Sequence, residues 1–366
     1  MTMLSSSLLK SASRALIPLL FASALLAQPA APVRLTLNEN PYGPSPAAVR
    51  AIQNDLKDLF RSVGDEEAAF VKLVAEHEGV SPDQIVIGDL LEALGLQLSL
   101  QGGPGGEFIY SVPGYPAMVD AAAPVGGVAV TVPLDAKHEN DLPGIMAKIT
   151  PRTRAIFLVN PHNPTGTVSD SAAFKTFVRA ASKRALVIVD EAYLEFSDDY
   201  AGRTVVDLVQ AGGNVLIYRT FSKAYGLAAL PLGYGIAPAK VAAALKKAGI
   251  GAPRSLNRLA LVAASATLRD PDYLKRVHAG ITTEREKWAR FLRELGLKYT
   301  PSQANFIFFD AGRPASDVTA ALLAQGVVVS RPFPPYDSWV RITIGLPGEN
   351  ERARAAVKAV FAGSAK

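Results

Sequence analysis

The sequence predicts an α/β protein, with a large domain built on a parallel or mostly parallel sheet and a smaller α+β domain after it. Two observations carry this prediction. Short, fully apolar segments alternate with helical segments between residues 84 and 218, which is typical of a parallel sheet covered by helices on both faces. From about residue 250 strands and helices follow one another in a looser order, which indicates a second, smaller unit.

The length and composition fit a well-packed globular protein. The chain has 366 residues, enough for two domains, and it is 49% hydrophobic and 19% charged. It contains no cysteine, which excludes disulfides, thiolate metal sites and cysteine nucleophiles. The net charge of +5 is modest, and no basic block with interleaved aromatic residues indicates a nucleic-acid partner. No histidine and carboxylate pattern indicates a metal.

The N-terminus has the order of a secretory signal peptide. Lys10 and Arg14 precede an apolar run from Ala15 to Ala27, small residues follow, and residues 1–30 contain no acidic residue. The run is too short for an ordinary membrane span. We therefore expect a signal peptide over residues 1–30, a periplasmic or exported protein, and no membrane span after removal of that peptide. The alternative is an N-terminal arm on a cytoplasmic protein.

The predicted elements divide the rest of the chain into three parts. An extended N-terminal segment covers residues 31–45 and breaks into a turn at Pro41 and Gly43. The large domain, residues 46–248, is expected to have helices at 45–60, 66–77, 140–149 and 171–183 and strands at 84–87, 108–110, 128–132, 155–159, 186–189 and 215–218. Another helix opens after the first of these strands, with Asp89 as its candidate N-cap.

The small domain is predicted to cover residues 249–366. A long helical region at 255–295 should break near Asp270-Pro271, because proline cannot continue a helix from the preceding turn. The remaining elements are expected to be strands at 305–308, 327–330 and 340–344 and helices at 316–325 and 349–361.

Three consecutive strand ends carry side chains that suit one cofactor. Asn163, Asp190 with Tyr193, and Lys223 each follow an apolar strand, and ligands of open parallel sheets bind at the carboxyl ends of the strands. A lysine amine can form an imine with an aldehyde, and a carboxylate can keep a pyridine nitrogen protonated. The amide and the phenol can hydrogen-bond a phenolate oxygen, and Tyr115 can stack on a ring face. This combination indicates pyridoxal 5'-phosphate.

Each of these residues alone has a simpler explanation. Lys223 could be a surface lysine in a polar turn, Asp190 a helix cap and Asn163 a turn residue. Tyr193 and Tyr115 are more often packing aromatics, so the combination and not any single residue carries the prediction.

The motifs resemble those of a known family. Asn163-Pro-Thr-Gly, Asp190-Glu-Ala-Tyr and Ser222-Lys-Ala-Tyr-Gly-Leu have their key residues 27 and 33 positions apart, which is similar to the class I/II pyridoxal-phosphate-dependent aminotransferases. The opening Asn38-Glu-Asn-Pro-Tyr42 resembles relatives of histidinol-phosphate aminotransferase. The resemblance runs from about residue 35 to the C-terminus. It implies the fold-type-I architecture: a large domain with a mixed, mostly parallel seven-stranded sheet, a small domain from both chain ends, and a homodimer with active sites at its interface.

The resemblance also implies a role for each matching residue. Lys223 would be the Schiff-base lysine and proton shuttle, Asp190 the partner of the pyridine nitrogen, Asn163 and Tyr193 the partners of the phenolate oxygen, and Tyr115 the stacking ring. The phosphate would be bound by Thr220, Ser222, the helix start at Leu91 and Glu92, and Tyr42 from the neighbouring subunit. The substrate would contact Arg341, Asn305 and Asn40. Arg331 is either a further substrate neighbour or a solvated loop arginine, and His162 is expected to be structural.

Two differences from the family concern the phosphate. The stretch Gly88-Asp-Leu-Leu-Glu92 has bulky leucines where the family has small residues. Position 231, eight residues after the lysine, is proline where the family has a phosphate-binding arginine. The family's Arg-Tyr-Pro segment corresponds to Arg61-Ser-Val63, so an aromatic residue is also missing. We therefore expect weaker retention of the cofactor.

The predicted function is an aminotransferase that moves an amino group between an amino acid or related, histidinol-phosphate-like amine and a 2-oxo acid. One alternative is a decarboxylase or lyase that uses the same cofactor on the same fold. A second alternative is a degenerate, exported binding protein.

Overall fold

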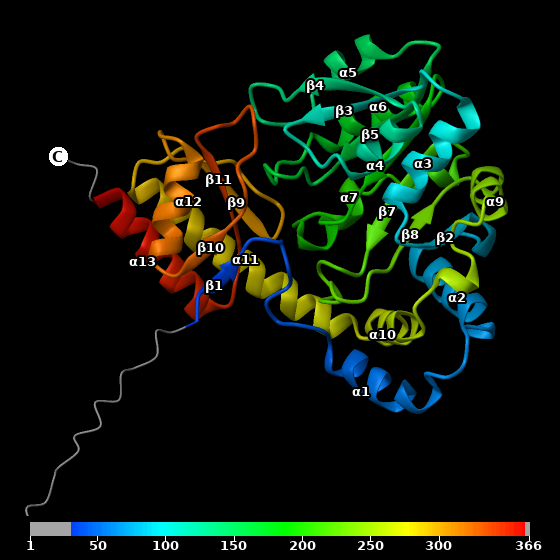
Figure 1. Ribbon diagram of the computed structural model, residues 1–366, viewed down its shortest axis with the longest axis horizontal. Coiled ribbons are helices and arrows are strands. Elements are labelled where there is room, and N and C mark those ends of the chain that lie inside the picture. Colours follow the sequence, from blue (N-terminus) through cyan, green and yellow to red (C-terminus); the bar gives the residue numbers. More distant parts are fainter. Residues whose placement is uncertain (1–30, 363–366) are drawn as a thin grey trace, which may run out of the picture. The chain divides into compact units, whose positions relative to one another are not determined.

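A seven-stranded mixed sheet forms the centre of the large part of the molecule (Figure 1). The structure is a computed structural model that describes residues 31–362, so the predicted signal peptide lies outside the described residues. Across the sheet, the strands are β2 (Ile85–Gly88), β8 (Gly233–Ile236), β7 (Val215–Thr220), β6 (Leu186–Asp190), β5 (Thr153–Val159), β3 (Glu107–Val112) and β4 (Val128–Pro133). Only β8 is antiparallel to its neighbours, as the predicted mixed, mostly parallel sheet requires.

Strand β8 is the element of this sheet that the sequence did not predict. Its residues Gly-Tyr-Gly-Ile lack the run of β-branched side chains that marks the other strands. Close packing explains both glycines: a Cβ on Gly233 would lie 2.5 Å from the carbonyl oxygen of Arg219, and a Cβ on Gly235 would lie 3.1 Å from the side chain of Leu90.

Helices cover both faces of the sheet, because alternate residues of each strand point into two separate hydrophobic cores. Val86 and Phe108 belong to one core, and their neighbours Ile87 and Ile109 belong to the other. The first core is closed by α3 (Leu91–Gly102), α4 (Ala117–Ala122) and α9 (Ala239–Lys247). The second is closed by α2 (Asp65–Glu78), α5 (Leu142–Lys148), α6 (Ser171–Ala181) and α8 (Val206–Gln210).

The N-terminal helix α1 (Pro46–Asp55) packs against α10 (Arg258–Leu268) at the edge of the large part. Ser45 is its N-cap and accepts a hydrogen bond from the backbone of Ala48. The helix is shorter than predicted, because a 3-10 turn follows at Leu56–Asp58. A short helix, α7 (Tyr200–Arg203), lies in the connection between β6 and β7, for which the sequence predicted no element.

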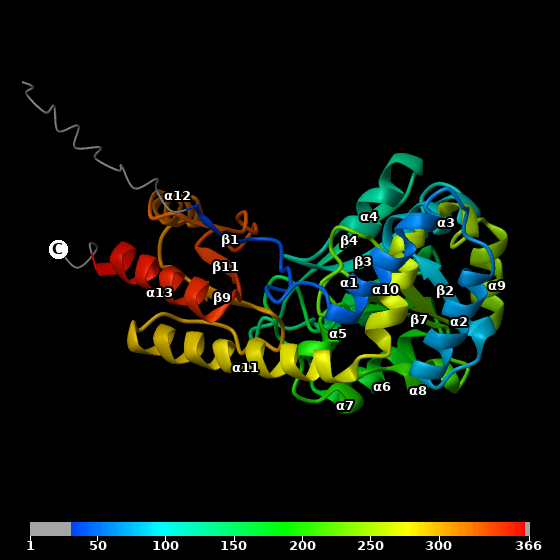
Figure 2. The same cartoon turned by 90° about the horizontal axis from the view of Figure 1, so that it is seen from below.

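The long helix α11 (Pro271–Glu294) leads from α10 to the smaller part of the molecule (Figure 2). The break between α10 and α11 lies at the predicted position, where Asp270 accepts a hydrogen bond from the backbone of Tyr273 and caps α11. None of the helices within residues 31–362 is long and apolar enough to cross a membrane.

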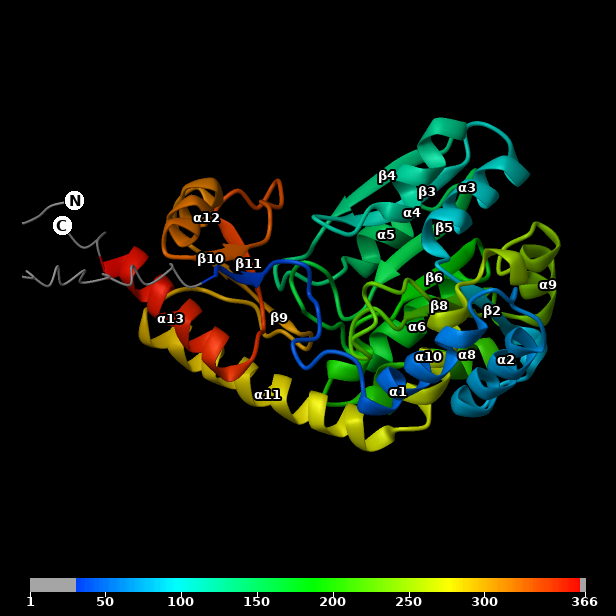
Figure 3. The same ribbon diagram turned by 60° about the horizontal axis from the view of Figure 1, so that its bottom comes forward.

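Both ends of the described chain contribute to the smaller part (Figure 3). Strand β1 (Val33–Leu35) pairs in parallel with β10 (Val327–Val329), and β9 (Phe306–Asp310) pairs in antiparallel with β11 (Trp339–Thr343). Helices α12 (Ala315–Ala324) and α13 (Pro347–Ala362) complete this part. A small unit built from both chain ends agrees with the expectation, while the boundary between residues 248 and 249 stays a prediction.

Candidate active site

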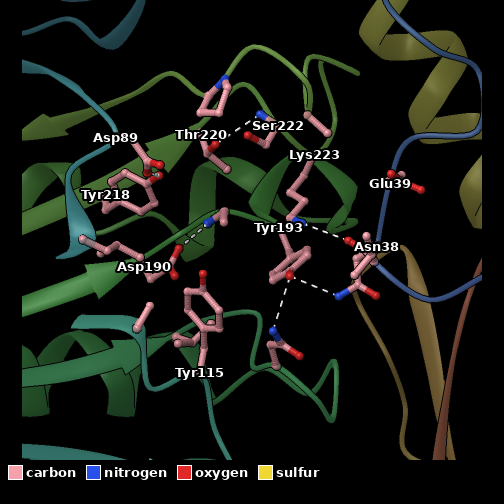
Figure 4. A pocket seen from close by; sticks show the side chains of 18 of the residues that line it. Asn38, Glu39, Asp89, Tyr115, Asp190, Tyr193, Tyr218, Thr220, Ser222 and Lys223 are labelled. Carbon is pink, nitrogen blue, oxygen red and sulfur yellow. Dashed lines mark hydrogen bonds between the residues drawn. The ribbon is translucent and has the colours of Figure 1, made fainter. Parts of the chain in front are cut away.

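The carboxyl ends of β5, β6 and β7 open into a cavity of about 570 Å³ (Figure 4). The cavity wall continues onto the N-terminal segment and onto β11, so it is built by segments far apart in the chain. The structure brings most of the predicted site residues to this wall: Leu91, Glu92, Tyr115, Asn163, Asp190, Tyr193, Thr220, Ser222, Lys223 and Arg341.

Lys223 lies in the loop that follows β7, with its amine directed into the cavity (Figure 4). Its Nζ donates a hydrogen bond to the backbone oxygen of Leu37 at 3.0 Å. Burial and, secondly, the positive charge of Arg341 lower the pKa of Lys223 to about 8. A neutral, nucleophilic amine is therefore present in a substantial fraction of molecules near neutral pH.

Asp190 ends strand β6 and is buried at the floor of the cavity. Its Oδ1 accepts a hydrogen bond from the backbone of Ala192 at 2.9 Å. Burial raises the pKa of Asp190 to about 7, although that backbone bond and the charge of Lys223 oppose the increase. A protonated nitrogen placed against this carboxyl would favour its ionised form.

Tyr193 presents a buried phenol to the cavity, and two side-chain amides hold it in place. Asn38 Nδ2 and Asn163 Nδ2 lie 3.1 Å and 3.4 Å from the Tyr193 hydroxyl oxygen and donate to it. Burial raises the pKa of Tyr193, so the phenol keeps its proton at neutral pH. Because the oxygen accepts from two amides, that proton is free to be donated to an oxygen atom in the cavity.

Arg341, on β11, supplies a buried cation to the same wall. Its NH1 donates to Asn163 Oδ1 at 2.5 Å. Its Nε and NH2 both donate to Ser330 Oγ, at 3.0 Å and 2.8 Å. NH2 also donates to the Thr36 carbonyl oxygen at 3.0 Å. Phe333 lies 4.8 Å from the guanidinium carbon. Burial lowers the pKa of Arg341 to about 10, so the guanidinium remains charged at neutral pH.

Two residues line the more open part of the cavity. Tyr115 is partly exposed, and burial followed by the charge of Asp190 raises its pKa to about 12. Arg331 is exposed and lies over the Phe333 ring, 5.0 Å from its centroid. Arg331 therefore lines the cavity and is also in contact with solvent.

Three predicted residues do not line this cavity. Asn305 donates to the carbonyl oxygens of Asn38 and Glu39. Asn40 donates at 2.8 Å to the carbonyl oxygen of Ala224, next to the lysine, and to a tyrosine hydroxyl on α11. Tyr42 packs its hydroxyl against α11, where a Cβ on the helix glycine would collide with it. In the described chain, these residues fix the N-terminal segment beside the lysine loop.

Asn38 is the site residue that the sequence did not single out. It belongs to the predicted Asn38-Glu-Asn-Pro-Tyr42 motif, but its contact with Tyr193 joins residues 155 positions apart. Asn38 also has a left-handed backbone, with φ of 55°, and its amide N–H donates to Thr343 Oγ1 at 2.9 Å. An asparagine tolerates that conformation better than most residues, which is the signal that the motif offered.

The region around Asp89 corrects one prediction. Asp89 is not the N-cap of α3, because Leu90 occupies that position without a side-chain cap bond. The Asp89 carboxylate instead lines the cavity, where the Tyr218 hydroxyl donates to it at 3.5 Å.

Comparison with known proteins decides the family. The family model described as aminotransferase class I and II matches residues 31–359. The chain belongs to this aminotransferase family. The agreement covers both the large sheet and the smaller part of the molecule.

Individual relatives of this aminotransferase agree over most of their length. The histidinol-phosphate aminotransferase of Limosilactobacillus fermentum is 39% identical over 330 residues, covering 89% of this chain and 90% of that protein. Histidinol-phosphate aminotransferase 2 of Pseudomonas fluorescens Pf-5 is 39% identical, covering 91% and 90%. The crystal structure of the Sinorhizobium meliloti histidinol-phosphate aminotransferase in complex with pyridoxal-5'-phosphate superposes with a TM-score of 0.83, at 31% identity and 92% coverage of both chains.

This aminotransferase is thus a fold-type-I enzyme that depends on pyridoxal phosphate. The ring end of the cavity fits the cofactor, because it offers an amine, a buried carboxyl and a phenol donor. The phosphate end fits less well. Of the residues described around the cavity, only Lys223, Arg331 and Arg341 are lysine or arginine, and Lys223 and Arg341 belong to the ring and substrate contacts proposed below.

Proposed function

We propose that this aminotransferase exchanges the amino group of an anionic, histidinol-phosphate-like amine or amino acid with a 2-oxo acid, and that Lys223 is its catalytic lysine. The observation that carries the proposal is the pairing of Lys223 and Asp190 in one cavity, each with a pKa moved toward neutrality by burial. Perturbed pKa values of this kind are characteristic of groups that exchange protons in catalysis.

Pyridoxal phosphate, when bound, supplies an electron sink that stabilises negative charge on the carbon that carries the amino group. With the cofactor bound, Lys223 would hold its aldehyde carbon as a neutral amine and, once freed by the substrate, would remove and return the proton at the carbon that carries the amino group. Asp190 would keep the ring nitrogen protonated. Tyr193 and Asn163 would donate hydrogen bonds toward the ring's oxygen substituent, and Tyr115 would cover one ring face.

Arg341 is proposed to bind the anionic group of the amino donor. Its position in the cavity wall and its charge at neutral pH support this role. Three of its N–H groups are fixed by Ser330 and Thr36, so the guanidinium orientation is set before a substrate binds. Arg331 at the more exposed part of the wall supplies a second cation for a larger anionic donor such as a phosphorylated amine.

Two further proposals concern the state of the protein. Exposed apolar side chains gather just after α1, at Leu56, Leu59 and Phe60, and they support a homodimer in which this region meets the partner. Light scattering on the purified chain should give twice the mass of one chain. The second proposal is that the chain is exported and that its signal peptide is removed. The intact mass of protein isolated from cells should then lack roughly the first 30 residues, and a mass of the full-length chain would contradict export.

The decisive experiment is a transfer assay with an isotope-labelled amino group. Purified enzyme is incubated with pyridoxal phosphate, 2-oxoglutarate and labelled histidinol phosphate, aspartate or another anionic donor in turn. We expect label in glutamate with at least one donor, and no label with Lys223→Ala, while Lys247→Ala, a change of an exposed lysine at the end of α9, should behave like wild type. A carbon dioxide or elimination product without labelled glutamate would instead support the decarboxylase or lyase alternative.

A further inference from the structure

The cavity has two sides with different chemistry. In Figure 4, Tyr193 and Asn38 lie on one side of the line from Lys223 to Asp190, and Thr220, Ser222 and Asp89 lie on the other. The first side carries the two amides and the phenol described above. The second side is where the 5' substituent of a pyridoxal ring belongs when its aldehyde meets Lys223 and its nitrogen meets Asp190, because the phenolate oxygen then faces Tyr193.

The donors on this second side are uncharged. Tyr218, Thr220 and Ser222 contribute hydroxyl groups, and the first turn of α3 contributes backbone N–H groups. The Tyr218 phenol is buried and its pKa is raised well above the usual value by burial and by Asp89, so it stays protonated. Hydroxyl and amide donors bind neutral and anionic acceptors alike, and they give less preference for a dianion than a guanidinium does.

One carboxylate borders this side, and a second carboxylate also lines the cavity. Asp89 is exposed and is not used as a helix cap, so its charge faces the cavity with the Tyr218 hydroxyl as its partner. Glu92, in the first turn of α3, also lines the cavity. These two negative charges offset the attraction of the α3 N-terminus for an anion.

Residue 231 adds no cation to this side. Of the described residues that line the cavity, only Arg331, which shares a neighbouring pocket with Glu92, is a lysine or arginine besides Lys223 and Arg341. Pro231 lines the cavity immediately before Leu232, whose carbonyl oxygen accepts from Thr220 Oγ1 and from the Phe221 backbone, so residue 231 lies on the same side as Thr220. Proline there has neither a charge nor a backbone N–H. A dedicated arginine would be worth about ten- to a hundredfold in affinity for a phosphate.

We propose that this cavity does not select the phosphorylated form of its cofactor and that it accepts pyridoxal, the same ring with a neutral 5' hydroxymethyl group, with comparable affinity. Asp89 sets this property, since its carboxylate repels a phosphate dianion but accepts a hydrogen bond from a hydroxymethyl group. The inference rests on the proposed capture of the aldehyde by Lys223. In that step the lysine nitrogen forms a C=N bond with the aldehyde carbon and one water molecule leaves.

The test compares the dissociation constants of pyridoxal and pyridoxal phosphate for the full chain after any bound cofactor has been removed. Bound aldehyde is reduced with borohydride, which adds hydride to the C=N bond, and mass spectrometry measures the modified Lys223 peptide. We expect the two constants to lie within about tenfold of each other.

Three variants give the proposal its specificity. Asp89→Asn should tighten pyridoxal phosphate severalfold and weaken or leave unchanged the binding of pyridoxal. Asp83→Asn removes the same charge from an exposed residue just before β2, instead of just after it, and should change neither constant. Pro231→Arg should tighten pyridoxal phosphate by about tenfold or more without a gain for pyridoxal.

The outcomes separate the two proposals. A wild-type preference for pyridoxal phosphate greater than about a hundredfold, with no effect of Asp89→Asn, would overturn the selectivity inference alone. If neither aldehyde is trapped on Lys223, both this inference and the proposed role of the lysine are overturned.

Discussion

The pKa of Lys223 gives the sharpest quantitative prediction. Burial and the charge of Arg341 lower this pKa to about 8, while Asp190 and Glu39 raise it. At pH 7, about 9% of Lys223 side chains should therefore be neutral, against about 0.03% for an unperturbed lysine. The reactive amine is thus about 300 times more abundant than it would be on an exposed lysine.

Removal of either neighbouring charge should move the Lys223 pKa, and the two changes should have opposite signs. Arg341→Met removes a positive charge that disfavours the ammonium form, so the pKa should rise. Asp190→Asn removes a negative charge that favours the ammonium form, so the pKa should fall below that of wild type. Neither substitution changes the residues of the lysine loop itself.

The assay is reductive methylation of the cofactor-free enzyme with formaldehyde and cyanoborohydride across a pH series. Mass spectrometry follows the initial labelling rate of Lys223, with Lys247 as an internal exposed lysine in the same sample. The Lys223 rate should titrate near pH 8 in wild type. Titration of Lys223 together with Lys247, or movement of both variants in the same direction, would refute this account of the site's electrostatics.

The remaining predictions concern stability and the support of the lysine loop. Arg219→Met should destabilise the fold by about 3–5 kcal/mol, since it leaves buried carboxylates such as Glu191, 2.7 Å from the guanidinium, without a cation; an unchanged melting temperature in calorimetry would contradict this. Burial lowers the pKa of His162 to about 3, so as the pH falls this histidine is protonated in the unfolded chain before it is protonated in the folded one. The free energy of unfolding should therefore drop by about 1.4 kcal/mol per pH unit between about pH 6 and 4. In denaturant titrations across this range, His162→Asn should lack this part of the pH dependence. Gly226→Ala should impair borohydride trapping on Lys223 because its Cβ would collide with the N-terminal segment, whereas Gly249→Ala, with a similar positive φ but open space, should keep it.

The main features of the fold were predictable because they depend on local patterns. Six of the seven central strands are apolar or largely apolar segments bounded by polar or glycine-containing turns, and the position of each catalytic candidate follows from its place just after such a strand. The break at Asp270-Pro271 was predictable for the same reason, since a capping aspartate and a proline mark a helix start within two residues. These signals do not depend on tertiary contacts.

The parts that the sequence missed depend on contacts between distant residues. Strand β8 is glycine-rich because β7 and Leu90 approach it closely, a constraint that no local pattern shows. Asn305 binds the backbone of residues 38 and 39, a contact that spans more than 260 positions and that the sequence does not show; its contact with substrate stays a prediction. Asp89 is a residue type that often caps helices, but α3 begins at Leu91, so Leu90 and not Asp89 is its N-cap.

The capture of pyridoxal phosphate by Lys223 tests the central claim most directly. Purified wild type and Lys223→Ala are incubated with the cofactor, reduced with borohydride and digested, and the modified peptide is identified by mass spectrometry. We predict one dominant modification, at Lys223, in wild type and none at that position in the variant. Modification spread over exposed lysines such as Lys247, with Lys223 unmodified at saturating cofactor, would contradict the assignment of this cavity as the active site.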